Sequence, residues 1–322
     1  MRVSSRSFPA VALFVAALGL TSTARAAAPM VKTQAPGFFR FMVGSFEVTA
    51  ISDGTVKLPM SKLLTNTRPE KTSAALKRAF LADEVETSVN TYLVNTGSKL
   101  VLIDTGAAAL FGPTLGNLLP NLKAAGYQPE QIDEIYITHM HPDHVGGLIA
   151  NGAIAFPNAT LRIDKADVDF WLDEARMKAA PESAKGFFQG AMASVNPYLA
   201  AKKLVTFTGA TELVPGVRAE PSHGHTAGHT SYVVESGGQK LVLWGDLVHA
   251  AAVQFADPGV TIQFDTDAKA AAVERKKADA DAAKNGYLVG ITHVAFPGVG
   301  HVRPAACGKG YEWLPLNYTG GK

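Results

Sequence analysis

Apolar and polar positions alternate along the first hundred residues in a way that predicts antiparallel strands. Residues 45–51 alternate and end at Asp53-Gly54, which predicts a turn. The β-rich runs 91–95 and 99–103 flank the turn residues Thr96-Gly97-Ser98, as the two strands of a hairpin do. We therefore expect the chain to start with antiparallel sheet.

Helical and β-rich segments take turns along the rest of the chain. Helical spacing of apolar residues is found at 115–125, 164–172 and 266–284, and short β-rich runs are found at 134–138, 231–235, 240–244 and 287–292. Two stretches, 135–139 and 288–293, end an apolar strand with Thr-His, so both deliver a histidine to a sheet edge. The pattern predicts a mixed α/β (α+β) fold with two similar halves.

The N-terminus has the three parts of a secretory signal peptide. Residues 1–6 carry two arginines and no acid, 8–20 form an apolar run, and Ala24-Arg25-Ala26 supplies a small-x-small cleavage site. The apolar run is well short of the roughly 20 residues needed to cross a bilayer. We expect residues 1–26 to be removed, which places the mature protein in the periplasm or outside the cell without a membrane partner. An uncleaved N-terminal anchor is the alternative.

Composition favours one large globular domain over residues 27–322. The chain is 47% hydrophobic with 30 glycines, and it has no linker or low-complexity tract that would divide it. Thirty basic against 28 acidic residues give a net charge of +2 without a basic stripe, which argues against nucleic acid as a partner. Cys307 is the only cysteine, so no disulfide can form within one chain.

A dense cluster of candidate metal ligands follows the run 134–138. The motif is His139-Met140-His141-Pro142-Asp143-His144, continuing into Val145-Gly146-Gly147. Imidazole nitrogens and a carboxylate oxygen suit zinc or a similar divalent ion. On a strand-to-loop turn, ligands two apart can face one metal, while Asp143 and His144 at the start of the next helix face a second. The spacing therefore favours two metals over a chance cluster of surface histidines.

Further ligands are expected in the second half, because all nine histidines lie between positions 139 and 301. The segment Ser222-His223-Gly224-His225-Thr226-Ala227-Gly228-His229 holds three, of which we favour His225 as the ligand and assign His223 and His229 to supporting hydrogen bonds. Asp246 ends an apolar strand and can bridge two ions; a turn or N-cap aspartate is the alternative. Asp104 follows another strand and is expected to orient a ligand histidine, with an ordinary turn aspartate as the alternative.

Together these motifs resemble the metallo-β-lactamase superfamily, which carries His-x-His-x-Asp-His, the first histidine of His-Thr-x-Gly-His, Gly-Asp and a terminal histidine. The resemblance implies a four-layer αββα sandwich with the site at one sheet edge. It implies that one metal is held by His139, His141 and His225, the other by Asp143, His144 and His293, and that Asp246 bridges them. It also favours His293 over His301 as the last ligand.

Such a site predicts hydrolysis by a metal-bridging hydroxide, since coordination to a dication lowers the pKa of water to about 7. Two dications, two aspartates and a hydroxide leave a net positive site, which stabilises charge developing on a carbonyl or phosphoryl oxygen. Zinc is the default for both ions, although manganese, cobalt or iron accept the same ligands. Asp143 is the only candidate proton carrier.

Several segments narrow the resemblance to the methyl parathion hydrolases and their dihydrocoumarin-hydrolysing relatives. They are Asn95-Thr96-Gly97-Ser98-Lys99-Leu100, Asp104-Thr105-Gly106-Ala107-Ala108, Phe111-Gly112-Pro113-Thr114-Leu115-Gly116 and Gly186-Phe187-Phe188. This resemblance points to Phe111, Trp171 and Phe187 as aromatic walls of a pocket for a small uncharged aryl substrate. Plain core packing is the alternative for these side chains.

Departures from that pattern decide the expected substrate. Leu63 stands where the methyl parathion hydrolases carry arginine, and His249 and Phe264 stand where they carry leucine. The larger side chains narrow the pocket on one side, which disfavours a bulky phosphotriester more than a flat lactone. We therefore expect an aryl lactonase or arylesterase with organophosphate hydrolysis as a side reaction. A true organophosphate hydrolase is the alternative.

Other classes fit the sequence less well. A β-lactamase needs a cation for the substrate carboxylate, and Arg162 and Lys165 are the only nearby candidates. Export and neutral charge argue against a nuclease, and His141 stands where a flavin-linked diiron oxidoreductase carries glutamate. A complete ligand set argues against a protein that merely binds metal. The apolar stretch 38–42 and the resemblance suggest a homodimer.

Overall fold

The computed structural model describes residues 28–306 and 308–318. The predicted signal peptide 1–26 and Cys307 lie outside the described residues. The chain divides into two units, Met1–Ala35 and Pro36–Lys322. Residues 28–35 of the first unit carry no helix or strand, and every described helix and strand belongs to the second unit.

Two seven-stranded mixed sheets form the centre of the second unit. The first has the order β1 (Phe38–Val43), β2 (Phe46–Pro59), β4 (Glu84–Asn95), β5 (Leu100–Ile103), β6 (Glu134–Tyr136), β9 (Thr160–Asp164) and β10 (Leu204–Phe207). The second has the order β11 (Thr211–Val214), β12 (Val217–Pro221), β13 (Thr230–Ser236), β14 (Gln239–Leu243), β16 (Leu288–Gly290), β17 (Val299–Pro304) and β18 (Tyr311–Pro315). Small ribbons pair β3 (Leu64–Thr65) with β15 (Thr261–Ile262) and β7 (Ile149–Ala150) with β8 (Ala153–Ile154).

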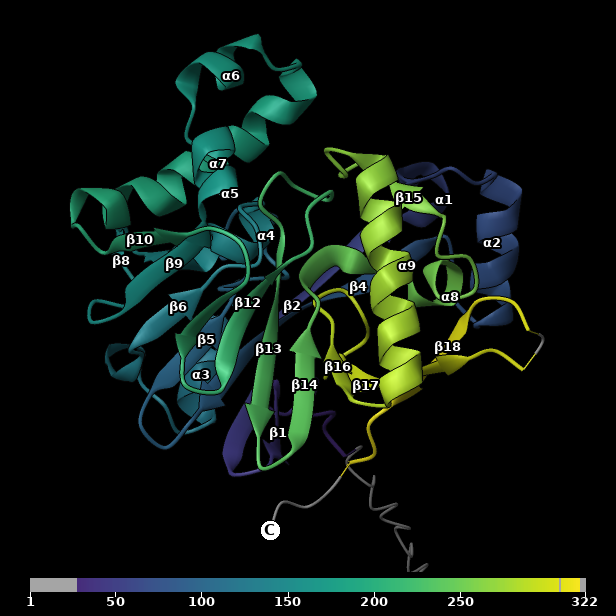
Figure 1. Cartoon of the computed structure of the whole chain (residues 1–322), viewed down its shortest axis with the longest axis horizontal. Helices are drawn as coiled ribbons and strands as arrows, with labels where there is room; N and C mark the ends of the chain where they lie inside the picture. Colours follow the sequence, from purple (N-terminus) through teal and green to yellow (C-terminus); the bar gives the residue numbers. More distant parts are fainter. Residues whose placement is uncertain (1–27, 307, 319–322) are drawn as a thin grey trace, which may run out of the picture. The chain divides into compact units, whose positions relative to one another are not determined.

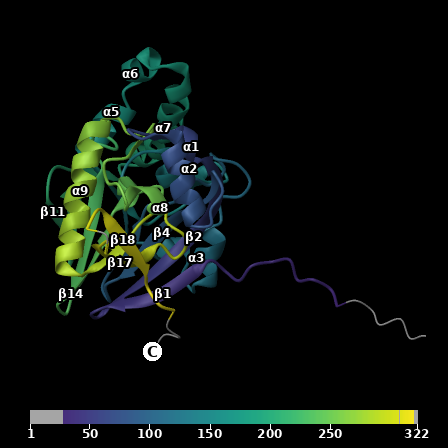
Figure 2. The ribbon, with the colours of Figure 1, turned by 90° about the vertical axis from the view of Figure 1, so that its right-hand side faces the viewer.

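Helices cover the outer faces of both sheets (Figures 1 and 2). On the side of the first sheet are α3 (Leu118–Ala124), α4 (Pro142–Val145), α5 (Lys165–Trp171), α6 (Glu174–Ala179) and α7 (Glu182–Ala200), and on the second sheet is α9 (Ala268–Asn285). The helices α1 (Met60–Leu63), α2 (Pro69–Arg78) and α8 (Ala251–Gln254) share an apolar cluster of their own. The 3-10 helices are η1 (Pro129–Gln131), η2 (Gly146–Leu148) and η3 (Gly245–Leu247).

Three apolar clusters join the four layers. Tyr232 belongs to the cluster between the two sheets. Ile135 of the first sheet shares a second cluster with Val195 of α7, and Val289 of the second sheet shares a third with Ala282 of α9. Because each sheet buries both faces, the architecture is the predicted αββα sandwich.

The predicted hairpin of β4 and β5 is confirmed, but two other predictions are wrong. Asp53-Gly54 is not a turn, because β2 continues through it to Pro59 with only a register shift. The Asp53 carboxylate instead accepts three backbone N–H bonds from the segment 107–118 and so anchors the loop before α3. Because these bonds hold residues 107–118 as a loop, α3 begins at Leu118, three residues later than the apolar spacing predicts.

The apolar stretch 38–42 makes up most of β1, an edge strand of the first sheet. Phe39 and Phe41 are buried in the cluster between the sheets, whereas Met42 is 46% exposed. The apolar side of this strand therefore packs within its own chain, and the homodimer stays a prediction. None of the described helices has the length and apolarity that crossing a bilayer requires.

Candidate metal centre

Strand ends from both sheets bring the candidate ligands together. After β6, Thr138 donates its backbone N–H to Asp104 Oδ1 at 2.8 Å, which fixes the turn before the first histidines. Pro142 then starts α4, because its fixed φ suits the first helical position. The loop after β6 supplies His139 and His141, and α4 supplies Asp143 and His144. His225 comes from the β12–β13 loop, Asp246 from η3 and His293 from the loop after β16.

A first group that can hold a metal ion consists of His139, His141, His225 and Asp246. His141 Nδ1 lies 3.0 Å from His139 Nε2 and 3.1 Å from His225 Nε2. Asp246 Oδ2 lies 3.3 Å from His225 Nε2 and 3.6 Å from His139 Nε2. Ligands about 2.1 Å from a tetrahedral zinc lie about 3.4 Å apart, so this spacing fits one divalent ion.

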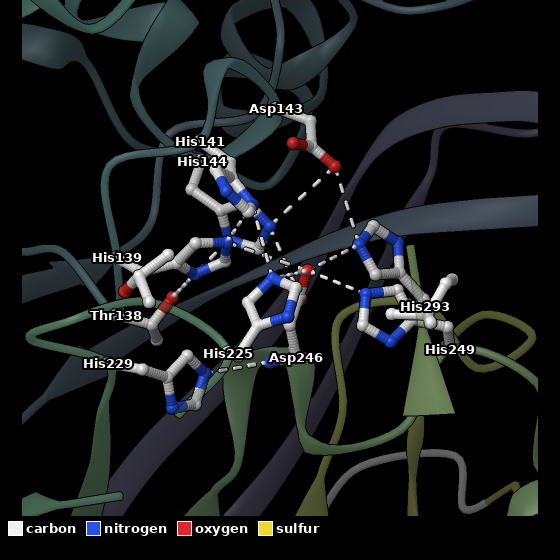
Figure 3. Close-up of polar contacts among 12 residues, drawn as sticks. Thr138, His139, His141, Asp143, His144, His225, His229, Asp246, His249 and His293 are labelled. Atoms are coloured by element: carbon white, nitrogen blue, oxygen red, sulfur yellow. Dashed lines mark hydrogen bonds and ion pairs between the residues drawn. The ribbon is translucent and has the colours of Figure 1, made fainter. Parts of the chain in front are cut away.

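A second group consists of Asp143, His144, His293 and again Asp246. His144 Nε2 lies 3.3 Å from Asp246 Oδ1, and His293 Nε2 lies 3.3 Å from Asp143 Oδ2 and 3.1 Å from Asp246 Oδ2. His144 Nε2 and Asp246 Oδ1 are buried without a hydrogen-bond partner among the described residues. A divalent cation bound here would satisfy both atoms, and the donor set of His and Asp side chains fits zinc. Figure 3 shows the two groups meeting at Asp246.

Three ligand histidines are oriented through their other ring nitrogen. His144 donates its Nδ1–H to Asp104 Oδ2 (2.8 Å), and His225 donates its Nδ1–H to Asp265 Oδ1 (2.7 Å). His293 donates its Nδ1–H to the Ser88 carbonyl (2.9 Å). These bonds fix the tautomer that leaves the Nε2 lone pair facing the centre. Asp104 thus has the place that the sequence predicts, whereas Asp265 was not anticipated, because the sequence around it lacks any motif that marks it.

Only one histidine of the segment 222–229 enters a ligand group. His229 accepts the backbone N–H of Asp246 at Nε2 (3.1 Å), and its Nδ1–H donates to Ser222 Oγ (2.9 Å). It therefore supports Asp246 from behind, outside both groups. His223 is exposed and pairs with Asp164 at 3.6 Å. His225 is the histidine of this segment that lies in a candidate ligand group, and it is the one that the sequence favours.

Burial and mutual charge set the protonation of the cluster. Burial acts to raise the pKa of Asp246, but the surrounding histidines, His144 first, hold that pKa well below its usual range. Burial lowers the pKa of both His139 and His141 well below the usual value. At His144 burial also acts to lower the pKa, yet the neighbouring carboxylates, Asp246 first, outweigh it and raise the pKa. Burial also acts to lower the pKa of His225 and His293, yet the neighbouring carboxylates, Asp246 first, raise it to about 9 and about 10. A divalent cation would compete with the protons of His144, His225 and His293, so its binding would release protons.

The two glycines that end the first motif let a neighbouring loop approach closely. A Cβ at Gly146 would lie 2.2 Å from the Ala107 carbonyl oxygen, and one at Gly147 would lie 1.9 Å from that of Thr105. Thr105 in turn donates its N–H and its hydroxyl to the His144 carbonyl, at 2.8 Å each. The loop after β5 is thereby fixed against the ligand-bearing helix α4.

An apolar cavity of about 560 Å³ opens beside His141. Its walls include Trp171, Phe187 and Phe264. The ring centroids of Trp171 and Phe187 lie 5.2 Å and 5.0 Å from that of His141, and Phe264 lies 6.2 Å from Phe187. Phe111 is 39% exposed and lies 6.5 Å from Phe187. The structure therefore groups the rings of Trp171, Phe264 and Phe111 around Phe187, next to His141.

The two other predicted pocket residues occupy different surroundings. His249 is buried, with Nε2 3.1 Å from Asp246 Oδ2 and its ring stacked on His293 at 5.1 Å. Burial lowers the pKa of His249 to about 4, so the ring is neutral. Leu63 packs with Phe264 against the cluster of α1, α2 and α8 and is not part of the cavity lining. The structure thus places His249 nearer the reacting centre than Leu63.

The cations that a β-lactamase would use for its substrate carboxylate are engaged elsewhere. Lys165 Nζ lies 2.6 Å from Asp169 Oδ2, and Arg162 Nε lies 2.6 Å from Glu134 Oε2. Neither side chain lines the cavity. The pocket therefore offers a penicillin carboxylate neither of the partners that the sequence suggested.

The αββα sandwich and the His/Asp donor set define a metal-dependent hydrolase built on this fold. The family model of the metallo-beta-lactamase superfamily matches residues 85–293. The chain therefore belongs to the metallo-beta-lactamase superfamily.

Solved structures and sequence relatives agree with this assignment. The hydrolase AbOPH of the beta lactamase superfamily is 37% identical with a TM-score of 0.84, covering 89% of this chain and 100% of that one. AidC, a dizinc quorum-quenching lactonase in complex with a product, is 29% identical with a TM-score of 0.81, covering 88% and 98%. N-acyl homoserine lactonases are similar over shorter spans. The one from a Bacillus sp is 30% identical, and the match covers 45% of this chain and 57% of the lactonase. The one from Bacillus cereus is 29% identical, and the match covers 58% of this chain and 74% of the lactonase.

Proposed function

We propose that the chain is an exported binuclear zinc hydrolase that opens aryl lactones and esters. The proposal is carried by the position of Asp246, whose two carboxylate oxygens face both ligand groups beside an apolar cavity. The similarity to lactonases, one of them a dizinc enzyme, supports both the metal and the reaction class. Export is supported by the N-terminal sequence pattern.

The two ligand groups would divide the metals between them, with Asp246 serving both. One ion would be held by His139, His141 and His225, and the other by Asp143, His144 and His293. When bound, the ions supply Lewis acidity and lower the pKa of water to about 7.

The protein's own residues hold this arrangement and handle the proton. His229 fixes the backbone of Asp246, and Asp104 and Asp265 fix the rings of two ligand histidines. Asp143 is the most exposed ligand, at 18% of its side chain, so its carboxylate is placed to pass a proton to the leaving group. A phenolate leaving group, with a pKa of about 10, needs little of that help.

The cavity favours an uncharged substrate with a flat ring. Trp171, Phe187 and Phe264 offer aromatic faces and edges next to the centre. Arg176 is the only cationic side chain of the lining, and it pairs with Asp173 at 3.3 Å and lies over Phe170. An aryl lactone fits this chemistry better than a charged ester.

His249 and Phe264 decide between a lactone and a phosphotriester in this proposal. Their ring centroids lie 6.2 Å apart, and His249 contacts the shared carboxylate of Asp246. Two rings at this position narrow the approach to the centre, which a planar lactone tolerates better than a tetrahedral phosphotriester. An organophosphate hydrolase of the methyl parathion hydrolase type is the second candidate, favoured by the motifs 104–108 and 111–116.

The deciding measurement is kcat/KM of the zinc-loaded mature protein for dihydrocoumarin, an N-acyl homoserine lactone and methyl parathion in one buffer. We expect the highest value for dihydrocoumarin. Preference for the N-acyl homoserine lactone would retain the lactonase but replace its substrate class. Preference for methyl parathion would overturn the lactonase and establish the second candidate.

A pair of variants separates pocket shape from overall fold. His249→Leu combined with Phe264→Leu should move the ratio of phosphotriester to lactone kcat/KM upward by roughly tenfold or more, because it widens the approach. Phe170→Leu, on the α5 wall of the same cavity, is the matched control and should leave the ratio in place. An unchanged ratio in the double variant would remove the specificity role of both residues.

A further inference from the structure

Asp167 is fully buried in α5, next to the two loops that carry most of the candidate ligands. We propose that Asp167 is a positioning residue, which ties these two loops together and thereby sets the affinity of the first ligand group. This inference rests on the proposed binuclear site and assigns a role to a carboxylate that holds no metal.

The Asp167 carboxylate accepts three hydrogen bonds, one from the first ligand loop and two from the second. Oδ2 accepts the backbone N–H of Met140 at 2.9 Å and the hydroxyl of Thr226 at 3.0 Å. Oδ1 accepts the backbone N–H of Gly228 at 2.6 Å. One buried carboxylate therefore links a loop of the first half of the chain to a loop of the second half.

These contacts lie beside the nitrogen ligands of the first group. Met140 separates His139 from His141, and Thr226 directly follows His225. The three imidazoles reach one metal from two separate loops, so their distances depend on how these loops are held. The second group instead draws a histidine from the loop after β16, which Asp167 does not contact through any of its three bonds.

The contact also explains two motif residues that bind no metal. Thr226 and Gly228 belong to the segment His-Thr-x-Gly-His, and both donate to Asp167. A Cβ at Gly228 would lie 2.5 Å from the backbone nitrogen of Asp167, so the loop can approach α5 this closely only with glycine. The threonine and the glycine thus both hold the second ligand loop against α5 through Asp167.

An ordinary helix-start role does not account for these bonds. A carboxylate in the first turn of a helix usually stabilises the free N–H groups there. In α5 this task belongs to Asp164, which caps the backbone N–H of Ala166 at 2.8 Å. The bonds of Asp167 all go to the ligand loops instead.

The test compares Asp167→Asn and Asp167→Ala with the wild type in zinc release from the loaded protein to a chromophoric chelator. We expect affinity at one of the two zinc sites to fall roughly 10- to 100-fold, more in the alanine variant, with the other site much less affected. Asparagine loses only the bond from Gly228, because its amide oxygen still accepts from Met140 and Thr226. Asp169→Asn, which changes an exposed carboxylate of the same helix that pairs with Lys165, is the matched control and should leave both zinc affinities unchanged.

Each outcome bears on one proposal. Equal zinc affinities in Asp167→Asn and wild type, or an equal loss of affinity in Asp169→Asn, would overturn the positioning role. If Asp167→Ala does not fold, Thr226→Val carries the test, since it removes one of the three bonds alone. Wild-type protein that binds fewer than two zinc ions would instead refute the proposed binuclear site, whatever the variants do.

Discussion

Asp246 is the residue on which both ligand groups depend. Its carboxylate lies within 3.6 Å of four histidine nitrogens that are candidate ligands. Asp246→Ala should therefore lose metal from both groups. It should lower kcat/KM by roughly 1,000-fold or more, because the metals that would stabilise charge on the reacting oxygen are no longer held. Metal content by elemental analysis and kcat/KM for a lactone check this expectation.

The control for this variant is Asp279→Asn, since Asp279 is also buried but belongs to neither ligand group. It should keep its metal content and its activity. Full activity in Asp246→Ala would exclude the shared role, and a loss of only one metal would assign Asp246 to a single group.

Asp279 itself gives a prediction on pH, because it is a buried acid on α9 with no described hydrogen-bond partner for either oxygen. Burial raises the pKa of Asp279 to about 7, and Arg275 opposes this only in part. An acid whose pKa is raised by folding stabilises the fold at low pH and loses that contribution as pH rises from about 4 to about 7. Asp279→Asn should therefore gain stability over the wild type by about 2 to 3 kcal/mol more at pH 8 than at pH 5.

Urea unfolding of both proteins at the two pH values measures this difference, and comparison at each pH cancels the contribution of the metals. Asp281→Asn, an exposed carboxylate on the same helix, is the matched control and should leave the wild-type dependence in place. A gap between Asp279→Asn and wild type that is equal at pH 5 and pH 8 would show that folding does not raise the pKa of this carboxyl, which would then be ionised in the folded protein at both pH values.

Two glycines of the chain differ in how closely neighbouring elements pack against them. Gly147→Ala should destabilise the fold by about 3 kcal/mol or more, because the added Cβ would overlap the Thr105 carbonyl and push the loop after β5 away from α4. Gly186→Ala, in the exposed part of α7 with nothing within 4 Å of the new Cβ, should gain about 0.5 to 1 kcal/mol instead. Urea unfolding of both variants tests the pair, and equal effects would contradict the packing argument.

Strands, helices and members of the candidate ligand groups were predictable from the sequence where the information is local. His139, His141 and His144 stand within six residues of one another, and the strand ending in Thr-His placed His293. Asp265 and Asp167 could not be predicted in this way, because their partners His225 and Met140 are 40 and 27 residues away. Their roles arise only when separate elements pack together.

Long-range contacts also explain why the predicted turn and the predicted start of α3 were wrong. Asp53-Gly54 has the composition of a turn, yet the strand pairing of β2 with β4 runs through it and the carboxylate is used by a segment more than 50 residues away. Tertiary hydrogen bonds outweigh local turn preference at such a place. The four-layer fold was nevertheless predictable, since the ligand motifs identify the superfamily and the alternation of strands and helices agrees with it.

At the scale of the whole molecule, the metals should contribute to stability, because their candidate ligands are buried polar groups from both sheets. Without a cation, His144 Nε2 and Asp246 Oδ1 have no partner among the described residues. An ion present at 100 times its dissociation constant stabilises the fold by about 2.7 kcal/mol. Removal of two such ions with a chelator should lower the Tm by roughly 10 °C or more, given about 2 to 4 °C per kcal/mol.

Thermal unfolding of the zinc-loaded protein, with and without chelator, measures this shift, and zinc added back in excess should restore the original Tm. Asp246→Ala should show a much smaller shift on chelation, because it has less metal to lose, whereas Asp279→Asn should respond like the wild type. A Tm that chelation leaves unchanged would mean that the two halves of the sandwich are held by their apolar clusters alone. The metals would then serve chemistry without joining the sheets whose strand ends bind them.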